Sequence, residues 1–243
     1  LFYVGAGTSG RLGILDASEC PPTFGTSPDL VQGIMAGGNE AIVRAVEGAE
    51  GNEELGRISI IEKNITERDT VVGITASGRT PFVLGAIREA KKAGAYTVGI
   101  SNCDGSLIQK EADIAITPIV GPEVIIGSTR MKSGTSQKLV LNMITTSVMI
   151  KLGKVYGNLM VDLQPTNEKL IDRAIRIIIH ATGVSYPEAK NLLEASGFNP
   201  KTAIVMIKTG LSRDEAEKLL ELAEGFVTRA VNIHLSTIRQ EKA

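Results

Sequence analysis

Cysteine is scarce in this chain of 243 residues, which contains Cys20 and Cys103 and no other cysteine. Two cysteines so far apart exclude a disulfide-rich scaffold and a zinc site of the usual paired spacing, and they are typical of a protein from a reducing cytoplasm. The chain also lacks an excess of charge of either sign, since its formal net charge is −1. Proteins that bind nucleic acid or membrane surfaces normally carry a basic excess, so neither partner is expected.

Long hydrophobic runs are missing as well. The most apolar long stretch, 139–152, is too short to cross a bilayer and is interrupted by Asn142 and Lys151. No secretory leader is expected. It begins at Leu1, without an initiator methionine and directly on a predicted strand, so we expect an N-terminal part of a longer protein to precede it. With 43% hydrophobic and 22% charged residues, the chain has ample material for a buried core.

Apolar runs alternate with amphipathic segments over the first two thirds of the chain. Short, nearly continuous apolar runs predict buried strands at 2–5, 30–36, 70–75, 96–101 and 114–118. Between them, helices are predicted at 10–18, 40–50, 53–64 and 81–93, and a long one follows at 134–152. This alternation predicts an α/β fold, in which helices cover both faces of a parallel sheet.

After Pro165 the pattern changes to helices alone. Start and stop residues predict four helices, at 168–181, 187–195, 201–208 and 213–239. Ser185 and Ser212, each followed three residues later by glutamate, read as capping boxes. We therefore predict an α/β domain at 1–165 and a small all-helical domain at 166–243.

Two glycine-rich turns with hydroxyl side chains follow two of the predicted strands. The first, Gly5–Gly10, reads GAGTSG, and the second, Ser77–Thr80, reads SGRT. Glycine lets the backbone approach an anion closely, and the helix N-terminus that follows adds N–H groups and a favourable dipole. The pair predicts a site for a small phosphorylated ligand at the carboxyl edge of the sheet.

Two other interpretations of the first turn remain open. Gly5, Gly7 and Gly10 also match the dinucleotide pattern GxGxxG, which requires an acidic residue about 20 positions on, at the end of the second strand. The corresponding stretch, 20–25, is predicted to be a loop without such a residue. Phosphate binding is therefore favoured over a nicotinamide cofactor and over turns that only connect a strand with a helix.

Longer motifs resemble those of one superfamily. The patterns GxGxSG at 5–10 and SGxT at 77–80 are similar to those of the sugar isomerase (SIS) domain, a flavodoxin-like α/β fold that binds phosphosugars. Within it, the stretches 5–13 and 16–24 closely resemble the N-acetylmuramic acid 6-phosphate etherases. The segment 121–135 resembles a signature that these etherases share with the glucokinase regulatory protein, and the likeness continues through 195–203. The resemblance covers essentially the whole chain, although the family carries a further helical segment ahead of Leu1.

The resemblance implies removal of a D-lactyl ether from C3 of the 6-phosphosugar, giving N-acetylglucosamine 6-phosphate and D-lactate in the recycling or catabolism of wall sugars. This is an elimination followed by addition of water, for which two carboxyl groups suffice, and no metal or other cofactor is expected. Glu19 and Glu50 match the family's two functional glutamates. We assign Glu19 as the acid toward lactate and then the base toward water, and Glu50 to proton transfer at C2. Glu47 is the closest competitor of Glu50.

We assign the binding of substrate and phosphate to both turns and to the segment before the long helix: Gly7, Thr8, Ser9, Ser77, Gly78, Arg79, Thr80, Ser128 and Lys132. Helix capping or solvation remains an alternative for Arg11 and Arg79, and solvation in a loop before a helix remains one for Arg130 and Lys132. An acidic role in the site remains an alternative for Glu123.

A homodimer is expected from the resemblance, since SIS proteins usually pair. Two rival functions remain open at this point, a non-catalytic sensor of phosphosugars and an aldose–ketose isomerase of phosphosugars. The presence of both Glu19 and Glu50 favours the lyase over the sensor. Release of D-lactate would distinguish the lyase from both.

Overall fold

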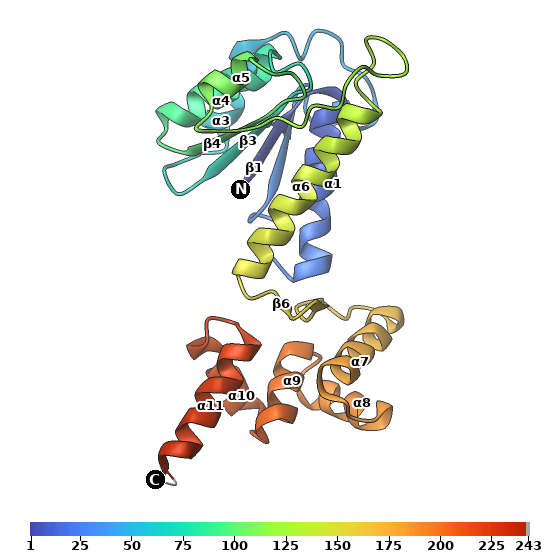
Figure 1. Ribbon diagram of the computed structural model, residues 1–243, viewed down its shortest axis with the longest axis vertical. Coiled ribbons are helices and arrows are strands. Elements are labelled where there is room, and N and C mark those ends of the chain that lie inside the picture. Colours follow the sequence, from blue (N-terminus) through green and yellow to red (C-terminus); the bar gives the residue numbers. More distant parts are fainter. Residues whose placement is uncertain (242–243) are drawn as a thin grey trace. The chain divides into compact units, whose positions relative to one another are not determined.

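A five-stranded parallel sheet forms the centre of the N-terminal part of the protein, whose computed structural model describes residues 1–241. The strands lie in the order β2-β1-β3-β4-β5 (Figure 1). Their bounds are β1 Phe2–Gly5, β2 Gln32–Met35, β3 Thr70–Ile74, β4 Tyr96–Ile100 and β5 Ile114–Ile116. The flavodoxin-like α/β fold predicted from the sequence is confirmed, with every predicted strand present.

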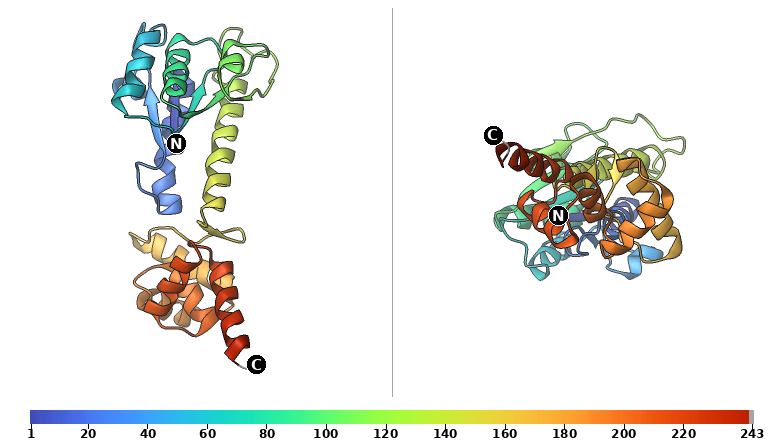
Figure 2. Two further views of the ribbon diagram at one scale, coloured as in Figure 1. Left: turned by 90° about the vertical axis from the view of Figure 1, so that its left-hand side faces the viewer. Right: turned by 90° about the horizontal axis from the view of Figure 1, so that it is seen from below.

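Alternate side chains of β1 face opposite sides of the sheet, as the two-residue period of a strand requires. Phe2 and Val4 are buried in one apolar cluster with side chains of α3 (Glu53–Glu62) and α4 (Pro81–Lys92). Tyr3 faces the other side of the sheet, against α1 (Gly7–Phe24). The two are so close there that a Cβ atom added to Gly13 of α1 would lie 2.8 Å from the Cβ of Tyr3. Helices therefore cover both faces, and α3 and α4 lie side by side in the turned view of Figure 2.

A buried polar cluster ties α1 to α6 (Lys132–Lys151) beneath the sheet. The Tyr3 hydroxyl donates to the Asp16 carboxylate at 2.9 Å, and the Asn142 amide donates to its other oxygen at 2.6 Å. Buried polar groups are costly unless they are paired, so these bonds fix how the two helices meet.

Two helix predictions were wrong at an end, and a third predicted helix is interrupted in its middle. The helix predicted at 10–18 is α1, which continues through Pro21 and Pro22 to Phe24, so the predicted loop at 20–25 is mostly helix. The helix predicted at 40–50 ends at Val43 as α2 (Glu40–Val43), because Arg44 is extended, with φ −131° and ψ 157°. The helix predicted at 213–239 is broken at Glu224 and Gly225, which both have positive φ.

The α-helical C-terminal segment contains five helices among the residues that the structure describes, one more than predicted. They are α7 Glu168–Thr182, α8 Tyr186–Ala195, α9 Pro200–Thr209, α10 Arg213–Leu222 and α11 Val227–Glu241. Their apolar faces share one core, in which Ile175, Ile178, Leu193 and Ile204 are almost completely buried. A short hairpin of β6 (Val155–Tyr156) and β7 (Leu159–Met160) precedes them and was not predicted.

Contacts group the chain into two compact units, residues 1–19 with 27–144 and residues 20–26 with 145 onward. The predicted division at residue 165 concerns independent domains and stays a prediction. Both glycine turns and both glutamates assigned to catalysis belong to the first unit.

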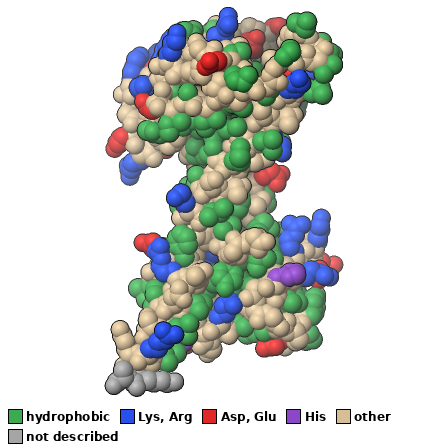
Figure 3. All heavy atoms as spheres, viewed as in Figure 1, with side chains coloured by type: hydrophobic (Ala, Val, Ile, Leu, Met, Phe, Trp, Pro, Cys, Tyr) green, Lys and Arg blue, Asp and Glu red, His purple; other side chains and the backbone are tan. Residues whose placement is uncertain are grey.

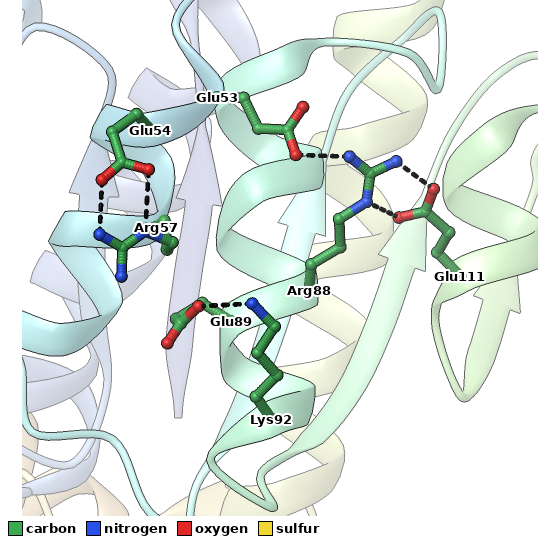
Figure 4. Close-up of polar contacts among 7 residues, drawn as sticks. All are labelled: Glu53, Glu54, Arg57, Arg88, Glu89, Lys92 and Glu111. Carbon is green, nitrogen blue, oxygen red and sulfur yellow. Dashed lines mark hydrogen bonds and ion pairs between the residues drawn. The ribbon is translucent and has the colours of Figure 1, made fainter.

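An ion-pair cluster joins α3, α4 and α5 (Leu107–Glu111) on the outer face of the first unit (Figure 4). Arg88 of α4 donates to both oxygens of Glu111 of α5, at 2.7 and 2.5 Å, and to Glu53 of α3 at 2.5 Å. Hydrogen bonds from Glu111 and Glu53 raise the pKa of Arg88 above its ordinary value. The planar guanidinium therefore clamps three helices, which a lysine could not do in the same geometry.

Replacing Arg88 by methionine should lower the free energy of unfolding by about 1 kcal/mol, because the clamp is partly exposed and screened by solvent. Lys92→Met is the matched control, since the ion pair of Lys92 is with Glu89 of its own helix, at 3.2 Å. We expect the control to change stability by less than about 0.5 kcal/mol. Urea unfolding of both variants measures the difference, and equal losses would contradict a cross-helix clamp.

Candidate functional site

The first glycine turn lies where β1 ends and α1 begins. Gly7 has φ +54°, which glycine adopts without strain, and the first N–H groups of α1 have no partner within the helix. Gly7 and Thr8 therefore stand at the expected anion-binding position. Ser9 differs, because its side chain is buried and its hydroxyl donates to the Gln137 amide oxygen of α6 at 2.8 Å.

The second turn follows β3 in the same way. Thr75 is buried, and its hydroxyl lies 2.7 Å from that of Thr80 and 3.4 Å from that of Ser77. Gly78 has φ +67°, and a Cβ atom there would lie 2.4 Å from the Ser106 hydroxyl, so only glycine fits. Arg79 is exposed beside it. The structure thus brings the hydroxyls of Ser77 and Thr80 together at the N-terminus of α4.

Glu50 lies in the loop between α2 and α3, not at the end of a helix as predicted. Its backbone carbonyl accepts a hydrogen bond from the Phe82 N–H at 3.1 Å, which ties this loop to the first turn of α4. Its side chain is exposed and lines a cavity of about 200 Å³. The cavity is also lined by Ala6, Gly7, Arg11, Met35, Ala36, Ala41, Arg44, Ala45, Val46, Glu47, Gly48 and Ala49. The structure therefore brings Glu50, its competitor Glu47 and the first glycine turn to one cavity.

Arg11 holds the wall of this cavity in place. Its guanidinium donates to the carbonyls of Ile42 and Ala41, each at 2.7 Å, and to that of Arg44 at 3.1 Å. These are the carbonyls that the end of α2 leaves without helical partners, so Arg11 caps α2. The helix-capping alternative for Arg11 is confirmed. Arg11 belongs to α1, and the helix that it caps is α2.

Glu19 lies apart from this cavity. It is exposed on α1, twelve residues beyond Gly7. At about 1.5 Å per residue, the helix separates the two positions by about 18 Å along its axis. Glu19 is not among the residues that line the cavity beside Glu50.

Ser128 and Lys132 lie around the long loop before α6. The Glu123 carboxylate accepts from the backbone N–H groups of Lys132 and Ser133, at 3.0 and 3.1 Å, and caps α6. These hydrogen bonds hold the pKa of Glu123 below its ordinary value. The Lys132 ammonium donates to the Pro122 carbonyl at 2.9 Å, and Ser128 lines a separate cavity of about 250 Å³ with Glu123 and other loop residues.

Apolar side chains on this loop point outward. Figure 3 shows hydrophobic side chains at the surface at the upper right, over the loop between β5 and α6. Val124, Ile125 and Ile126 are exposed by 74%, 70% and 94%. Large apolar side chains at this exposure are typical of a surface that contacts another molecule.

Several cavity residues were missed by sequence reasoning. Met35 is the last residue of β2 and Ala36 follows it, while Arg44 and Val46 follow α2; none of these segments contains a recognisable motif. The available signal was topological, because β2 lies beside β1 and the carboxyl ends of parallel strands meet at one edge.

Within residues 1–241, no three His, Cys, Asp or Glu side chains are grouped as a metal site would require. No helix among those residues has the length and hydrophobicity needed to cross a bilayer.

Comparisons with known proteins identify the family. The glucokinase regulatory protein N-terminal SIS domain matches residues 1–91, and the SIS domain matches residues 59–147. The chain is 67% identical over 233 residues to the N-acetylmuramic acid 6-phosphate etherase of Clostridium acetobutylicum, an alignment covering 96% of this chain and 77% of that relative. It is 57% identical to the etherase of Caldanaerobacter subterraneus, covering 96% and 76%, and 54% identical to that of Clostridioides difficile, covering 95% and 76%. With this identity over nearly its whole length, the chain belongs to the N-acetylmuramic acid 6-phosphate etherase family.

Proposed function

We propose that this chain is a carbon–oxygen lyase that cleaves the D-lactyl ether of N-acetylmuramic acid 6-phosphate during the catabolism of wall sugars. The relatives named above carry that activity in their names. The observation that best supports a catalytic site is Glu50, whose side chain shares a cavity with the first glycine turn while its backbone is bonded to the second turn's helix.

In the proposed mechanism, the N-terminus of α1 and the Ser77 and Thr80 hydroxyls bind the phosphate. The sugar ring opens to the aldehyde, which makes the C2 proton acidic. The Glu50 carboxylate accepts that proton, the C2–H electron pair forms the C2–C3 double bond, and the C3–O bond breaks. An acid protonates the departing lactate oxygen. Water then adds at C3 and a proton returns to C2, so the sum is substrate plus water to N-acetylglucosamine 6-phosphate plus D-lactate.

An assay for D-lactate tests this function directly. Purified protein mixed with N-acetylmuramic acid 6-phosphate should release D-lactate and N-acetylglucosamine 6-phosphate in equal amounts. Binding of the sugar without lactate release would favour the sensor, and an aldose–ketose interconversion would favour the isomerase.

We also propose a cytoplasmic location, which the scarcity of cysteine supports.

The proposed acid, Glu19, requires a second copy of the chain. It lies about 18 Å along α1 from the turn beside Glu50, whereas a general acid acts within about 3 Å of the atom that it protonates. A homodimer in which Glu19 of one copy reaches the Glu50 cavity of the other removes this conflict. The exposed apolar side chains of the 119–131 loop, and Leu139 and Met143 on α6, support pairing.

Mixing two inactive variants tests this arrangement. In a dimer of one Glu19→Gln chain and one Glu50→Gln chain, one of two symmetric sites keeps both glutamates. Coexpression of differently tagged chains in equal amounts should therefore recover about a quarter of the parent's lactate release, although each variant alone is nearly inactive. Purified mixed dimers without recovered activity would show that both glutamates act within one chain or that Glu19 is not the acid.

A further inference from the structure

A hydrogen-bond network at the carboxyl edge of the sheet links the segments after β1, β4 and β5 through one buried side chain, Gln137 of α6, which is 1% exposed. Its amide oxygen accepts from Ser9, in the turn after β1, at 2.8 Å. Its amide nitrogen donates to the side-chain oxygen of Asn102, in the loop after β4, at 3.1 Å. Asn102 in turn donates to the Pro118 carbonyl, after β5, at 2.9 Å and to the Ser136 hydroxyl at 2.8 Å.

The donor and the acceptor of each hydrogen bond in this network can be assigned, starting from Pro118 and Ser136. The Pro118 carbonyl can only accept, so the nitrogen of the Asn102 amide must face it. Ser136 donates its own proton to the Ser133 carbonyl, so it too can only accept from Asn102. The Asn102 oxygen therefore faces Gln137, which must present its nitrogen there and its oxygen to Ser9.

One consequence concerns the Ser9 proton. A hydroxyl has one proton, and that of Ser9 is committed to Gln137. Ser9 therefore has no proton to give to a phosphate oxygen, although its hydroxyl lies in the phosphate-binding turn. Its backbone N–H is in the first turn of α1, where N–H groups have no partner within the helix.

We propose that Gln137 is a positioning residue, which orients the first glycine turn for phosphate by fixing Ser9. The proposal rests on the proposed function, and it changes the role assigned to Ser9. Ser9 anchors the turn, and the backbone N–H groups at the start of α1 make the phosphate contacts. Loosening the anchor should weaken phosphosugar binding without changing the chemistry at Glu50.

A double-mutant cycle measured as binding of N-acetylglucosamine 6-phosphate tests this. We expect Ser9→Ala and Gln137→Met each to weaken binding by about 10-fold, an effect of about 1.4 kcal/mol. If Gln137 acts through Ser9, the double variant should also lose only about 10-fold. Gln32→Met is the control, because Gln32 also makes two side-chain hydrogen bonds but lies at the amino end of β2, and its binding should match the parent.

A loss of about 100-fold in the double variant would overturn the proposal, because it would mean that Ser9 contacts the ligand independently of Gln137. Unchanged binding in both single variants would overturn it as well. Steady-state kinetics separate a positioning role from unfolding. If Gln137 positions the turn, the variants should have a raised KM and an unchanged kcat per folded molecule. If the variants are merely partly unfolded, the fraction of active enzyme should fall and KM should stay unchanged. The binding readout needs no turnover, so failure of the parent to release lactate would count against the proposed function alone.

Gln137→Glu provides a second variant if Gln137→Met does not fold. A protonated glutamic acid can accept from Ser9 and donate to Asn102, whereas the ionised form cannot donate. Relative to the parent at the same pH, binding by this variant should be near normal at pH 5 and weaker at pH 8. A constant ratio across this range would contradict the proposal.

Discussion

Replacing Glu50 by glutamine should lower D-lactate release by about 10²–10⁴-fold, the range for loss of a general acid or base. Glutamine keeps the size and one acceptor of the side chain but cannot take up the C2 proton. Binding of N-acetylglucosamine 6-phosphate should remain within a few-fold of the parent, because neither glycine turn is altered. Exchange of the C2 proton with solvent deuterium, followed by NMR, should fall together with lactate release.

Two further glutamates make this result specific. Glu47→Gln is the matched control, since Glu47 lines the same cavity and is also exposed. It should leave exchange within a few-fold of the parent, and loss of exchange in Glu47→Gln alone would transfer the role of base to Glu47. Glu19→Gln should lose lactate release and retain exchange, because the acid acts after C2 has been deprotonated. Undiminished lactate release by Glu50→Gln would eliminate the proposed mechanism.

Local sequence signals predicted the sheet well. Buried parallel strands carry nearly continuous apolar runs, so β1 was located at its observed ends and the others within a few residues. The two glycine turns were also located correctly. Each turn contains a residue with positive φ, Gly7 or Gly78, and such a conformation favours glycine, which is visible in the sequence.

Features that depend on distant contacts could not be predicted in this way. The sequence 40–50 has the composition of a helix, but Arg11 binds the carbonyls at Ala41 and Ile42, and the chain leaves the helix at Arg44. Glu50 is therefore in a loop rather than at a helix end. Ser9 lies in a phosphate-binding motif, yet its partner is 128 positions away on α6. Spacing along the chain contains no information on either contact.

The position of Glu50 depends on an unusually close approach of α3 and α4. A Cβ atom on Gly56 of α3 would lie 1.9 Å from the Phe82 carbonyl oxygen, and one on Gly85 of α4 would lie 2.1 Å from the Glu53 carbonyl oxygen. Both obstacles are backbone atoms, which cannot rotate away as a side chain can. The two helices can meet at this distance only with glycine at both positions. Their N-terminal ends carry Glu50 and the second turn, joined by the bond from Phe82 to the Glu50 carbonyl.

Gly85→Ala should therefore lower the free energy of unfolding by about 3 kcal/mol or more, although alanine is intrinsically the better helix former by about 1 kcal/mol. Gly134→Ala, in α6, is the matched control, because the nearest atom to its added Cβ would be 3.4 Å away, on a methyl group of Thr8. The control should be neutral or stabilising by up to about 1 kcal/mol. Denaturant unfolding gives both values. Because Gly85→Ala forces α3 away from α4, the molecules that remain folded should also exchange the C2 proton more slowly, as Glu50 moves from the second turn. If the Gly85→Ala variant were as stable and as active as the parent, α3 and α4 would be able to move apart without displacing Glu50. The loop between α2 and α3 would then hold Glu50 in place without the close contact of the two helices.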